Sequence, residues 1–369
     1  MMFTCLQENL EKGLNTVYKA IPTKSSLPIL NNILIKTENG RLKLSATNME
    51  TAISTYVGAS IDKEGQITIP AKLIREFVSN VSQNALTGNL LNEVLHVTSD
   101  KTKTKFVGTE ASEYPNLPAF NEKTKFITVS PKTFGDAVAR ITYSASGDET
   151  RPVFTGVYIN YAEGILTLAA SDGFRLSETK IEAKGEVEPF TLIIPAKVLL
   201  EVSRIFSAAT EELKIGFNES ENLSLFQADD TVVSTRLIDG QYPDYKRIVP
   251  KESNVSAVFP AGELLEAVRL SNIFAKEMNN VIKLRLDPEG SIYVVTNAQE
   301  TGDHQSQINS EVEGETVEIA FNSKYLLDFL SNNKTDRIQL KANGSLAPCI
   351  FIPEGEDNFY HIVMPMQLN

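Results

Sequence analysis

Few residues of this chain belong to the types that catalysis at neutral pH usually requires. The 369 residues include three histidines, His96, His304 and His361, and none lies near a serine or cysteine in a recognised nucleophile motif. Glycine-rich phosphate loops, the GxSxG motif and paired CxxC motifs are also absent from the sequence. The sequence therefore favours a non-catalytic protein without a metal or cofactor.

A lysine recurs at one position of a repeated pattern. It ends "ITIPAK" as Lys72, "LIIPAK" as Lys197 and "IAFNSK" as Lys324, and apolar residues at helical spacing follow it each time. Each lysine thus begins a predicted helix, where the partial positive charge of the helix end disfavours a cation by roughly 0.3–1 kcal/mol. One such lysine is explained by solvation, but three indicate a shared anionic partner such as a phosphate backbone.

The three lysine-bearing helices belong to three larger units, since the lysines are 125 and 127 residues apart. Each unit begins with another amphipathic pattern, and between its two helices strand-like runs flank a turn of the type Asn-Gly, Glu-Gly or Pro-Glu-Gly. The upstream patterns run from Leu6 to Ile21, Phe134 to Ile141 and Leu264 to Val268. The sequence predicts an α+β fold of three tandem copies, with domains 1–121, 122–250 and 251–369.

Charge and cysteine content restrict the setting. The formal net charge is −12, and residues 1–120 carry 12 basic and 11 acidic groups whereas residues 251–369 carry 9 and 17. Solubility explains this acidity, and so does complementarity between the two ends of the chain. The two cysteines, Cys5 and Cys349, form no disulfide framework, and the sequence has neither a signal peptide nor an apolar run of the roughly 20 residues that cross a bilayer. A cytoplasmic protein with no membrane partner is predicted.

Five ordered motifs connect the chain with a known family. They are "LPILNNILI" at 27–35, "SDGFRLS" at 171–177, "LIDGQYPDYKRIVP" at 237–250, "FNSKYLLD" at 321–328 and "VMPMQL" at 363–368. Over its whole length the chain resembles the β sliding clamps, the processivity subunits of bacterial DNA polymerase III. The resemblance implies a head-to-tail homodimer of six similar domains that encircles double-stranded DNA irrespective of its sequence, with helices lining the hole and sheets outside.

The resemblance also implies partners and residues. Partners would be the replicative polymerase, the clamp loader and repair proteins, which bind through short apolar motifs. Lys24 and Lys197 match DNA-contacting positions, whereas Lys72 and Lys324 are added by the repeat alone; Phe106 and Leu270 match the dimer contact. A peptide pocket between the second and third domains would consist of Arg151, Phe154, Ser171, Gly173, Phe174, Arg175, Leu176, Pro243, Arg247, Ile248, Ala347, Ile362, Met364, Pro365, Met366, Gln367 and Leu368.

Several positions depart from the family pattern. Phe174 stands where histidine is common and Gln367 where a basic residue is usual, which is expected to alter partner preference rather than abolish binding. Arg269 stands beside Leu270 in place of an apolar residue, and Asp148 replaces an uncharged one. Two other functions remain open at this stage: a triplicated structural or adhesion module, and an enzyme working between domains. The apolar C-terminus is also compatible with a last edge strand whose Ile362 fills its own core.

Overall fold

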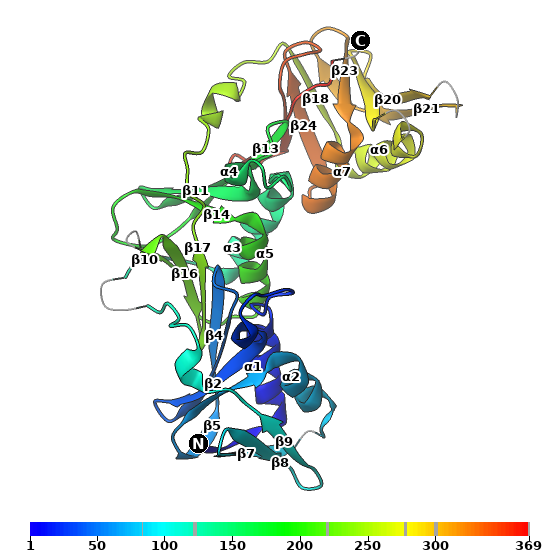
Figure 1. Ribbon diagram of the computed structural model, residues 1–369. Helices are drawn as coiled ribbons and strands as arrows, with labels where there is room; N and C mark the ends of the chain where they lie inside the picture. Colours follow the sequence, from blue (N-terminus) through cyan, green and yellow to red (C-terminus); the bar gives the residue numbers. More distant parts are fainter. Residues whose placement is uncertain (83, 121–123, 219–220, 277–278, 299–301, 368–369) are drawn as a thin grey trace. The chain divides into compact units, whose positions relative to one another are not determined.

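The computed structural model describes residues 1–369 except 83, 121–123, 219–220, 277–278, 299–301 and 368–369. Contacts divide the chain into two compact units. Unit 1 consists of residues 1–132, 184–187 and 201–237, and unit 2 consists of residues 133–183, 188–200 and 238–369. Both units contain antiparallel sheets with helices packed against them, as expected for an α+β protein (Figure 1).

Unit 1 holds two sheets (Figure 1). In spatial order, the first consists of β5 (Ala59–Lys63), β1 (Met2–Leu6), β7 (Ala85–Leu91), β8 (Val94–Thr98) and β9 (Lys103–Val107). The second consists of β10 (Lys125–Val129), β15 (Leu213–Asn218), β16 (Leu223–Ala228), β17 (Thr231–Arg236), β4 (Thr51–Val57), β3 (Arg41–Thr47), β2 (Asn32–Glu38) and β6 (Gln66–Pro70).

Unit 2 also holds two antiparallel sheets. Its larger sheet consists, in spatial order, of β14 (Phe190–Pro195), β11 (Gly156–Ala162), β12 (Ile165–Ser171), β13 (Arg175–Glu182), β26 (Phe359–Val363), β25 (Cys349–Pro353), β24 (Arg337–Ala342), β18 (Val255–Pro260) and β22 (Glu311–Glu313). The smaller sheet consists of β21 (Gly302–Asn309), β20 (Ser291–Ala298), β19 (Val281–Asp287) and β23 (Val317–Asn322). The last strand, β26, pairs on both sides and is therefore not an edge strand.

The predicted pairs of amphipathic helices are confirmed. They are α1 (Gln7–Tyr18) with α2 (Ala71–Asn80), α3 (Pro131–Ile141) with α5 (Ala196–Ile205), and α6 (Ala261–Ala275) with α7 (Ser323–Asn332); a short helix, α4 (Pro152–Thr155), precedes β11. In α1 the apolar face buries Leu10, Leu14 and Val17. The helix is shorter than predicted because Leu6 lies at the end of β1, half-exposed, and Ile21 lies beyond the last turn.

The predicted hairpins are also present, and their turns have the backbone that their residues allow. Asn39 and Gly40 link β2 to β3 with φ of 52° and 71°, and Glu163 and Gly164 link β11 to β12 with φ of 52° and 78°. Two successive positive φ angles match the right-handed twist of the flanking strands. These short connections determine the register, so that the apolar side chains of each strand face the helices.

The middle repeat explains why three repeats form two units. Its strands β10, β15, β16 and β17 continue the sheet of the first repeat through the β17–β4 pair, and its strands β11 to β14 continue the sheet of the third repeat through the β13–β26 pair. Backbone hydrogen bonding thus ties one half of the middle repeat to each neighbour. The domain boundaries near 121 and 250 stay predictions, because the contacts follow the sheets.

Candidate functional site

The residues predicted for peptide binding all belong to unit 2, on and around the β13–β26 junction. Leu176 and Ile362 are paired across this junction, and both are buried in one apolar cluster together with Tyr242 and Tyr245. Ile362 therefore contributes to the core beneath the surface rather than to the surface. The junction provides a rigid floor from which the neighbouring turn and tail extend.

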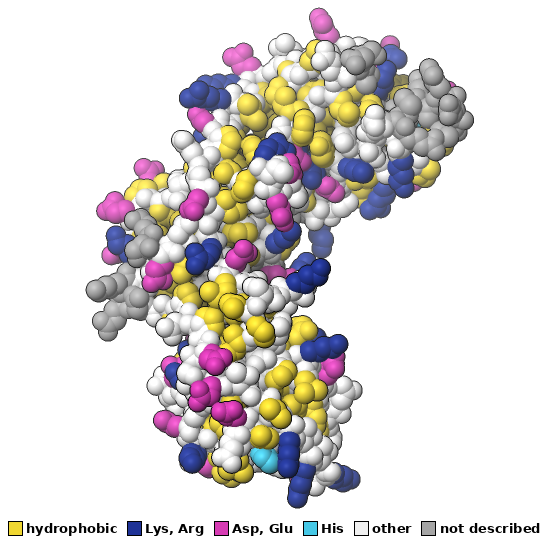
Figure 2. All heavy atoms as spheres, viewed as in Figure 1, with side chains coloured by type: hydrophobic (Ala, Val, Ile, Leu, Met, Phe, Trp, Pro, Cys, Tyr) yellow, Lys and Arg dark blue, Asp and Glu magenta, His cyan; other side chains and the backbone are white. Residues whose placement is uncertain are grey.

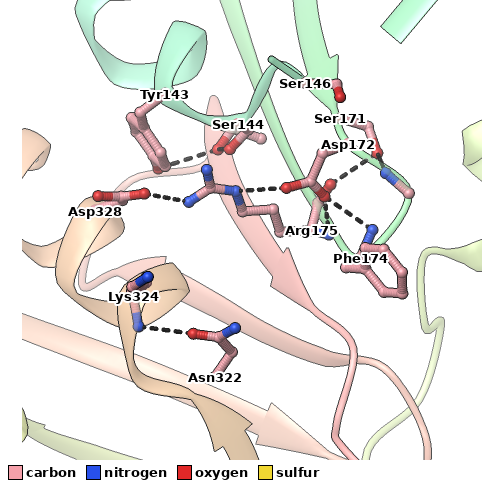
Figure 3. A network of polar contacts seen from close by, with 12 residues as sticks. Tyr143, Ser144, Ser146, Ser171, Asp172, Phe174, Arg175, Asn322, Lys324 and Asp328 are labelled. Atoms are coloured by element: carbon pink, nitrogen blue, oxygen red, sulfur yellow. Dashed lines mark hydrogen bonds and ion pairs between the residues drawn. The ribbon is translucent and has the colours of Figure 1, made fainter. Parts of the chain in front are cut away.

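The turn between β12 and β13 is held by its own side chains (Figure 3). The Ser171 hydroxyl donates to the carbonyl of Arg175 at 2.7 Å and accepts from the backbone N–H of Gly173 at 3.1 Å. Asp172 Oδ1 accepts from the N–H groups of Phe174 at 2.9 Å and Arg175 at 3.0 Å. Gly173 has φ of +95°, which favours glycine. The turn consequently presents Phe174 to solvent with 57% of its surface exposed.

Arg175 joins this turn to the third repeat. Its Nε is 3.1 Å from Asp172 Oδ2, and its Nη1 is 2.5 Å from Asp328 Oδ2 on α7 (Figure 3). The guanidinium also lies over the ring of Tyr325, 4.7 Å from its centroid. Only 10% of the Arg175 side chain and 14% of the Asp172 side chain are exposed, so this pair is weakly screened by water, whereas Asp328 is 45% exposed. Arg175 therefore fixes the turn against α7.

The C-terminal tail continues β26 along the same turn. The N–H of Met364 donates to the carbonyl of Phe174 at 2.8 Å, and the N–H of Met366 donates to the carbonyl of Ala320 at 2.8 Å. Met364, Pro365 and Met366 are half-buried, and Gln367 is exposed. The predicted residue Leu368 lies outside the described part of the chain. Backbone bonds thus fix the tail and leave its flexible thioether side chains partly accessible.

An aromatic group supports the remaining predicted residues. Phe154 packs edge-to-face against Tyr242, with ring centroids 6.1 Å apart, and the Arg151 guanidinium lies 5.3 Å from the Phe154 ring. Pro243 follows Tyr242 in the chain, and Arg247 and Ile248 belong to the 3₁₀ helix η5 (Tyr245–Ile248). Ile248 is 45% exposed, and Ala347 is half-buried next to exposed Leu346. Apolar side chains at the surface therefore accompany exposed cations.

Two buried polar residues, for which the sequence predicted no role in the site, stabilise this floor. Glu178 accepts a hydrogen bond from the Tyr245 hydroxyl at 2.5 Å. His361 Nδ1 is 2.8 Å from the Ser177 hydroxyl, and its ring stacks on Phe329 with centroids 4.9 Å apart. Burial, with the nearby Arg175 charge, lowers the pKa of His361 to about 3, so the ring is neutral at physiological pH. No local sequence signal pairs Glu178 with Tyr245 or Asp328 with Arg175, because these partners are distant in the chain.

The four lysines predicted to contact DNA are all exposed. Lys72, Lys197 and Lys324 each occupy the second residue of their helices α2, α5 and α7. Lys72 is 79% exposed, and its only described ion pair is a long one of 3.9 Å to Glu76. Lys24 and Lys72 belong to unit 1, whereas Lys197 and Lys324 belong to unit 2. The predicted position of the repeated lysine is confirmed, and its role in DNA contact stays a prediction.

The two residues predicted for the dimer contact differ in exposure. Phe106 on β9 is 1% exposed and packs edge-to-face against Phe77, with centroids 5.4 Å apart. Leu270 on α6 is 41% exposed, and Arg269 beside it is exposed. Phe106 thus completes the core of unit 1 in the single chain, and next to it Val107 is 74% exposed.

Two further searches cover only the described residues. They contain no group of three or more His, Cys, Asp or Glu side chains that could hold a metal ion. In that same part of the chain, every helix is too short or too polar to span a bilayer. Figure 2 shows side chains of both charges on the visible face of each unit, with hydrophobic side chains between them.

Comparison with known proteins covers the whole chain. The N-terminal, central and C-terminal domain families of the DNA polymerase III β subunit match residues 1–118, 128–244 and 246–367. The chain is 31% identical to the β sliding clamp of Synechococcus elongatus over 376 residues, covering all of both chains. It is 28% identical to that of Staphylococcus epidermidis, covering 100% and 99%. The crystal structure of the Bacillus subtilis sliding clamp superposes with a TM-score of 0.95 at 26% identity, covering all of both chains.

Proposed function

This chain belongs to the β sliding clamp family, the non-catalytic processivity subunits of DNA polymerase III, and from that premise we propose that two copies close head to tail into a ring around double-stranded DNA. It is a replication factor of three tandem clamp domains. Processivity in this proposal comes from topology, because a closed ring stays on DNA without binding it tightly. The cytoplasm, where the replicating chromosome lies, is its proposed location.

The strand order is the observation that carries the ring. Each internal junction joins two half-sheets of neighbouring repeats through their last strands. β17 of the middle repeat pairs with β4 of the first repeat, and β26 of the third repeat pairs with β13 of the middle repeat. The corresponding strands at the two ends are β9 in unit 1 and β21 in unit 2. Within the described residues both are sheet edges with one partner each. In a dimer in which β9 of each copy pairs with β21 of the other, two further junctions of this kind would form, and they would close the ring.

Charges on the two edges support this pairing. Lys103 and Lys105 are exposed on β9, and Asp303 is exposed on β21. The same asymmetry appears in the whole sequence, since residues 1–120 carry one excess positive charge and residues 251–369 carry eight excess negative charges. Opposite charges on two surfaces favour a head-to-tail arrangement over a symmetric one. Val107 and Leu270 would then provide apolar contact near that edge, and buried Phe106 would support β9 from the core of unit 1.

Exposed lysines at three equivalent helix starts support the DNA contact. Because six helices of this kind would face a common centre in the ring, Lys72, Lys197 and Lys324 would each provide a cation to the phosphate backbone, and Lys24 another from its exposed loop. Such contacts are independent of base sequence and weaken as salt rises. The remainder of the acidic surface repels DNA, which suits a ring that slides.

Partner binding would use the surface around the β13–β26 junction. Exposed Phe174 and Ile248, with the half-buried methionines of the tail, offer apolar side chains above a floor of tyrosines. An adaptable thioether surface suits several partners with one short motif, such as the polymerase, the clamp loader and repair proteins. Phe174 and Gln367 provide bulk and neutral polarity, which would bias the choice among these peptides.

Retention on circular DNA tests the ring. Protein loaded by its clamp loader onto nicked circular DNA should stay bound through gel filtration at high salt, and cutting the circle once should release it. Lys197→Glu with Lys324→Glu should reduce loading while leaving the dimer intact by light scattering. Retention on linear DNA, or a monomer at micromolar concentration, would contradict the ring.

Removal of the tail tests the peptide surface separately. A chain ending at Val363 should lose binding of an apolar clamp-binding peptide, by at least tenfold in Kd, because Met364 and Met366 are absent. The same chain should still form dimers, since β26 and both sheet edges are retained. Unchanged peptide affinity would show that partners bind elsewhere.

A further inference from the structure

A hollow of about 510 Å³ lies in unit 1, between the sheet face at the β4–β17 junction and the connecting segment 111–120. Its size is typical of ligand sites in proteins. All of its lining residues belong to unit 1, so it is distinct from the tail surface of unit 2. The two junctions have the same architecture, which allows a position-by-position comparison.

The turn beside the hollow repeats the turn of unit 2 bond for bond. The Thr47 hydroxyl donates to the carbonyl of Thr51 at 2.9 Å and accepts from the N–H of Met49 at 3.0 Å. Asn48 Oδ1 accepts from the N–H groups of Glu50 at 3.0 Å and Thr51 at 2.7 Å. The chain then leaves β17 as it leaves β26, because the N–H of Arg236 donates to the carbonyl of Glu50 at 2.9 Å. Residues 47–51 therefore correspond to residues 171–175.

This correspondence shows why the hollow exists. Strand register and the shared Tyr-Pro pair match six lining residues of unit 1 with six residues of unit 2. The matched pairs are Ser45 with Ala169, Ser54 with Glu178, Leu117 with Tyr245, Val232 with Tyr360, Gln227 with Ile352 and Tyr114 with Tyr242. In unit 2 the phenol of Tyr245 occupies this space and donates to Glu178. In unit 1 smaller side chains at three of these positions leave the space open.

Two lysines give the hollow its charge. Lys43 Nζ lies 2.9 Å from Glu38 Oε2 and 5.3 Å from the centroid of the Tyr56 ring, and Lys36 Nζ lies 3.8 Å from Glu38 Oε1. Two cations thus share one carboxylate, and no Asp or Glu is among the described lining residues. The hydroxyls of Ser45 and Ser54, which bond to each other at 2.8 Å, add donors and acceptors to the floor. One excess positive charge therefore borders a space that is large enough to hold an aromatic ring together with its neighbouring residues.

We propose that this hollow binds a short segment of a partner protein in which an aromatic side chain stands beside a carboxylate. The ring takes the space that Tyr245 occupies in unit 2, and the carboxylate reaches Lys43 or Lys36. Leu34 and Leu117 provide the apolar contact for the ring. Each copy of the chain would then carry a second peptide site that needs neither the tail nor the residues of the first.

A nucleic acid strand fits these observations less well. One excess cation offers little to a polyanion, and the chain carries a formal net charge of −12, which repels phosphates at long range. A peptide with a single carboxylate is repelled much less than a polyanion. The matched contact in unit 2 is moreover a side chain of the protein's own connecting segment, which shows that an amino-acid side chain fits such a space.

The probe is the capped tripeptide acetyl-Pro-Asp-Tyr-amide, which copies residues 243–245. In saturation-transfer NMR, we expect transfer to its ring from the full chain and equally from a chain that lacks residues 364–369. The double variant Ser54→Glu with Leu117→Tyr rebuilds the filled junction of unit 2, so transfer should fall at least tenfold. Lys43→Gln should reduce transfer severalfold, as should a tripeptide with Asn in place of Asp.

Lys63→Gln is the matched control, because Lys63 is exposed on β5 and lies outside the hollow. It should leave the transfer unchanged. Equal transfer with the filled variant, or its loss on deletion of the tail, would overturn the proposal while leaving the ring and the tail surface untouched. Stronger transfer to tetrathymidylate than to the peptide, abolished in the filled variant, would overturn it in favour of a nucleic acid site.

Discussion

The β4–β17 junction of unit 1 and the β13–β26 junction of unit 2 share a backbone and differ in their side chains. Both have the same hydrogen-bonded turn and the same departing chain. The unit 2 junction carries an ion-paired arginine, a buried glutamate and a buried histidine. The matching positions of unit 1 are Thr51, Ser54 and Val233.

This difference separates what the fold requires from what a binding surface requires. Since unit 1 makes the turn without any of the three charged or titratable residues, the turn itself does not depend on them. Their burial in unit 2 costs desolvation free energy that the fold could avoid. We infer that they hold Phe174 and the tail in position for partners. Substitutions that remove one of these differences at a time test this inference.

Replacing Arg175 should reduce the free energy of unfolding more than the other substitutions at the two junctions. Arg175→Leu leaves Asp172 and Asp328 without their cation, and we expect a loss of roughly 3 kcal/mol in unfolding free energy, the lower end for a broken buried pair because Asp328 is 45% exposed. Chemical denaturation measures it. Thr51→Leu at the matched position should cost under about 0.5 kcal/mol, because Thr51 holds no ion pair there. Equal losses would contradict a special role for Arg175.

Acid should destabilise the chain through His361. Its pKa is lowered to about 3 in the folded protein from an ordinary value of 6.5, so the unfolded state binds a proton first as pH falls. The contribution of neutral His361 to the free energy of unfolding is complete above pH 6.5. It is lost below that pH at about 1.4 kcal/mol per pH unit, which amounts to about 2 kcal/mol by pH 5. His361→Val, which copies Val233, should remove this slope between pH 7.5 and 5 in denaturation series. An unchanged slope would assign the acid sensitivity to other groups.

The sequence predicted more of the fold than of the buried polar contacts that support the unit 2 junction. Helical spacing, Asn-Gly and Glu-Gly turns and the recurring lysine predicted the repeated units, because those signals are local. Arg175 and Phe174 were named as site residues through the SDGFRLS motif, whereas Asp328, the last residue of FNSKYLLD, and Glu178 were given no role. Their partners lie 153 and 67 residues away in the chain, so only the folded sheets bring them together. The hollow in unit 1 could not be predicted either. It exists because three side chains are smaller than their counterparts in unit 2, and only the folded sheets show which residues are counterparts.

Neutralising Glu178 should have a smaller effect. In Glu178→Gln the Tyr245 hydroxyl keeps an acceptor of the same shape but loses a charged one, and charged hydrogen bonds are stronger by about 1 kcal/mol. Burial raises the pKa of Tyr245, with the Glu178 carboxylate adding to it, so the hydroxyl stays protonated in both proteins. We expect a loss of about 1 to 1.5 kcal/mol in urea denaturation. Ser54→Ala in unit 1, which loses only a neutral bond to Ser45, should cost less.

The smallest effect concerns the residue at the corner of each turn. Gly173 and Met49 occupy the same place with φ of +95° and +76°, a region in which an L-residue costs roughly 1 kcal/mol. A Cβ at Gly173 would lie 3.4 Å from Arg151 Nη1, an ordinary contact, so Gly173→Ala should lose about 1 kcal/mol through backbone strain alone. Met49→Gly relieves the same strain but frees the unfolded chain, and its net change should stay within about 0.5 kcal/mol. Paired thermal and urea denaturation of the two variants measures this asymmetry. If Gly173→Ala were as harmless as Met49→Gly, the two turns would be interchangeable, and the glycine would have to be explained by the approach of a partner peptide.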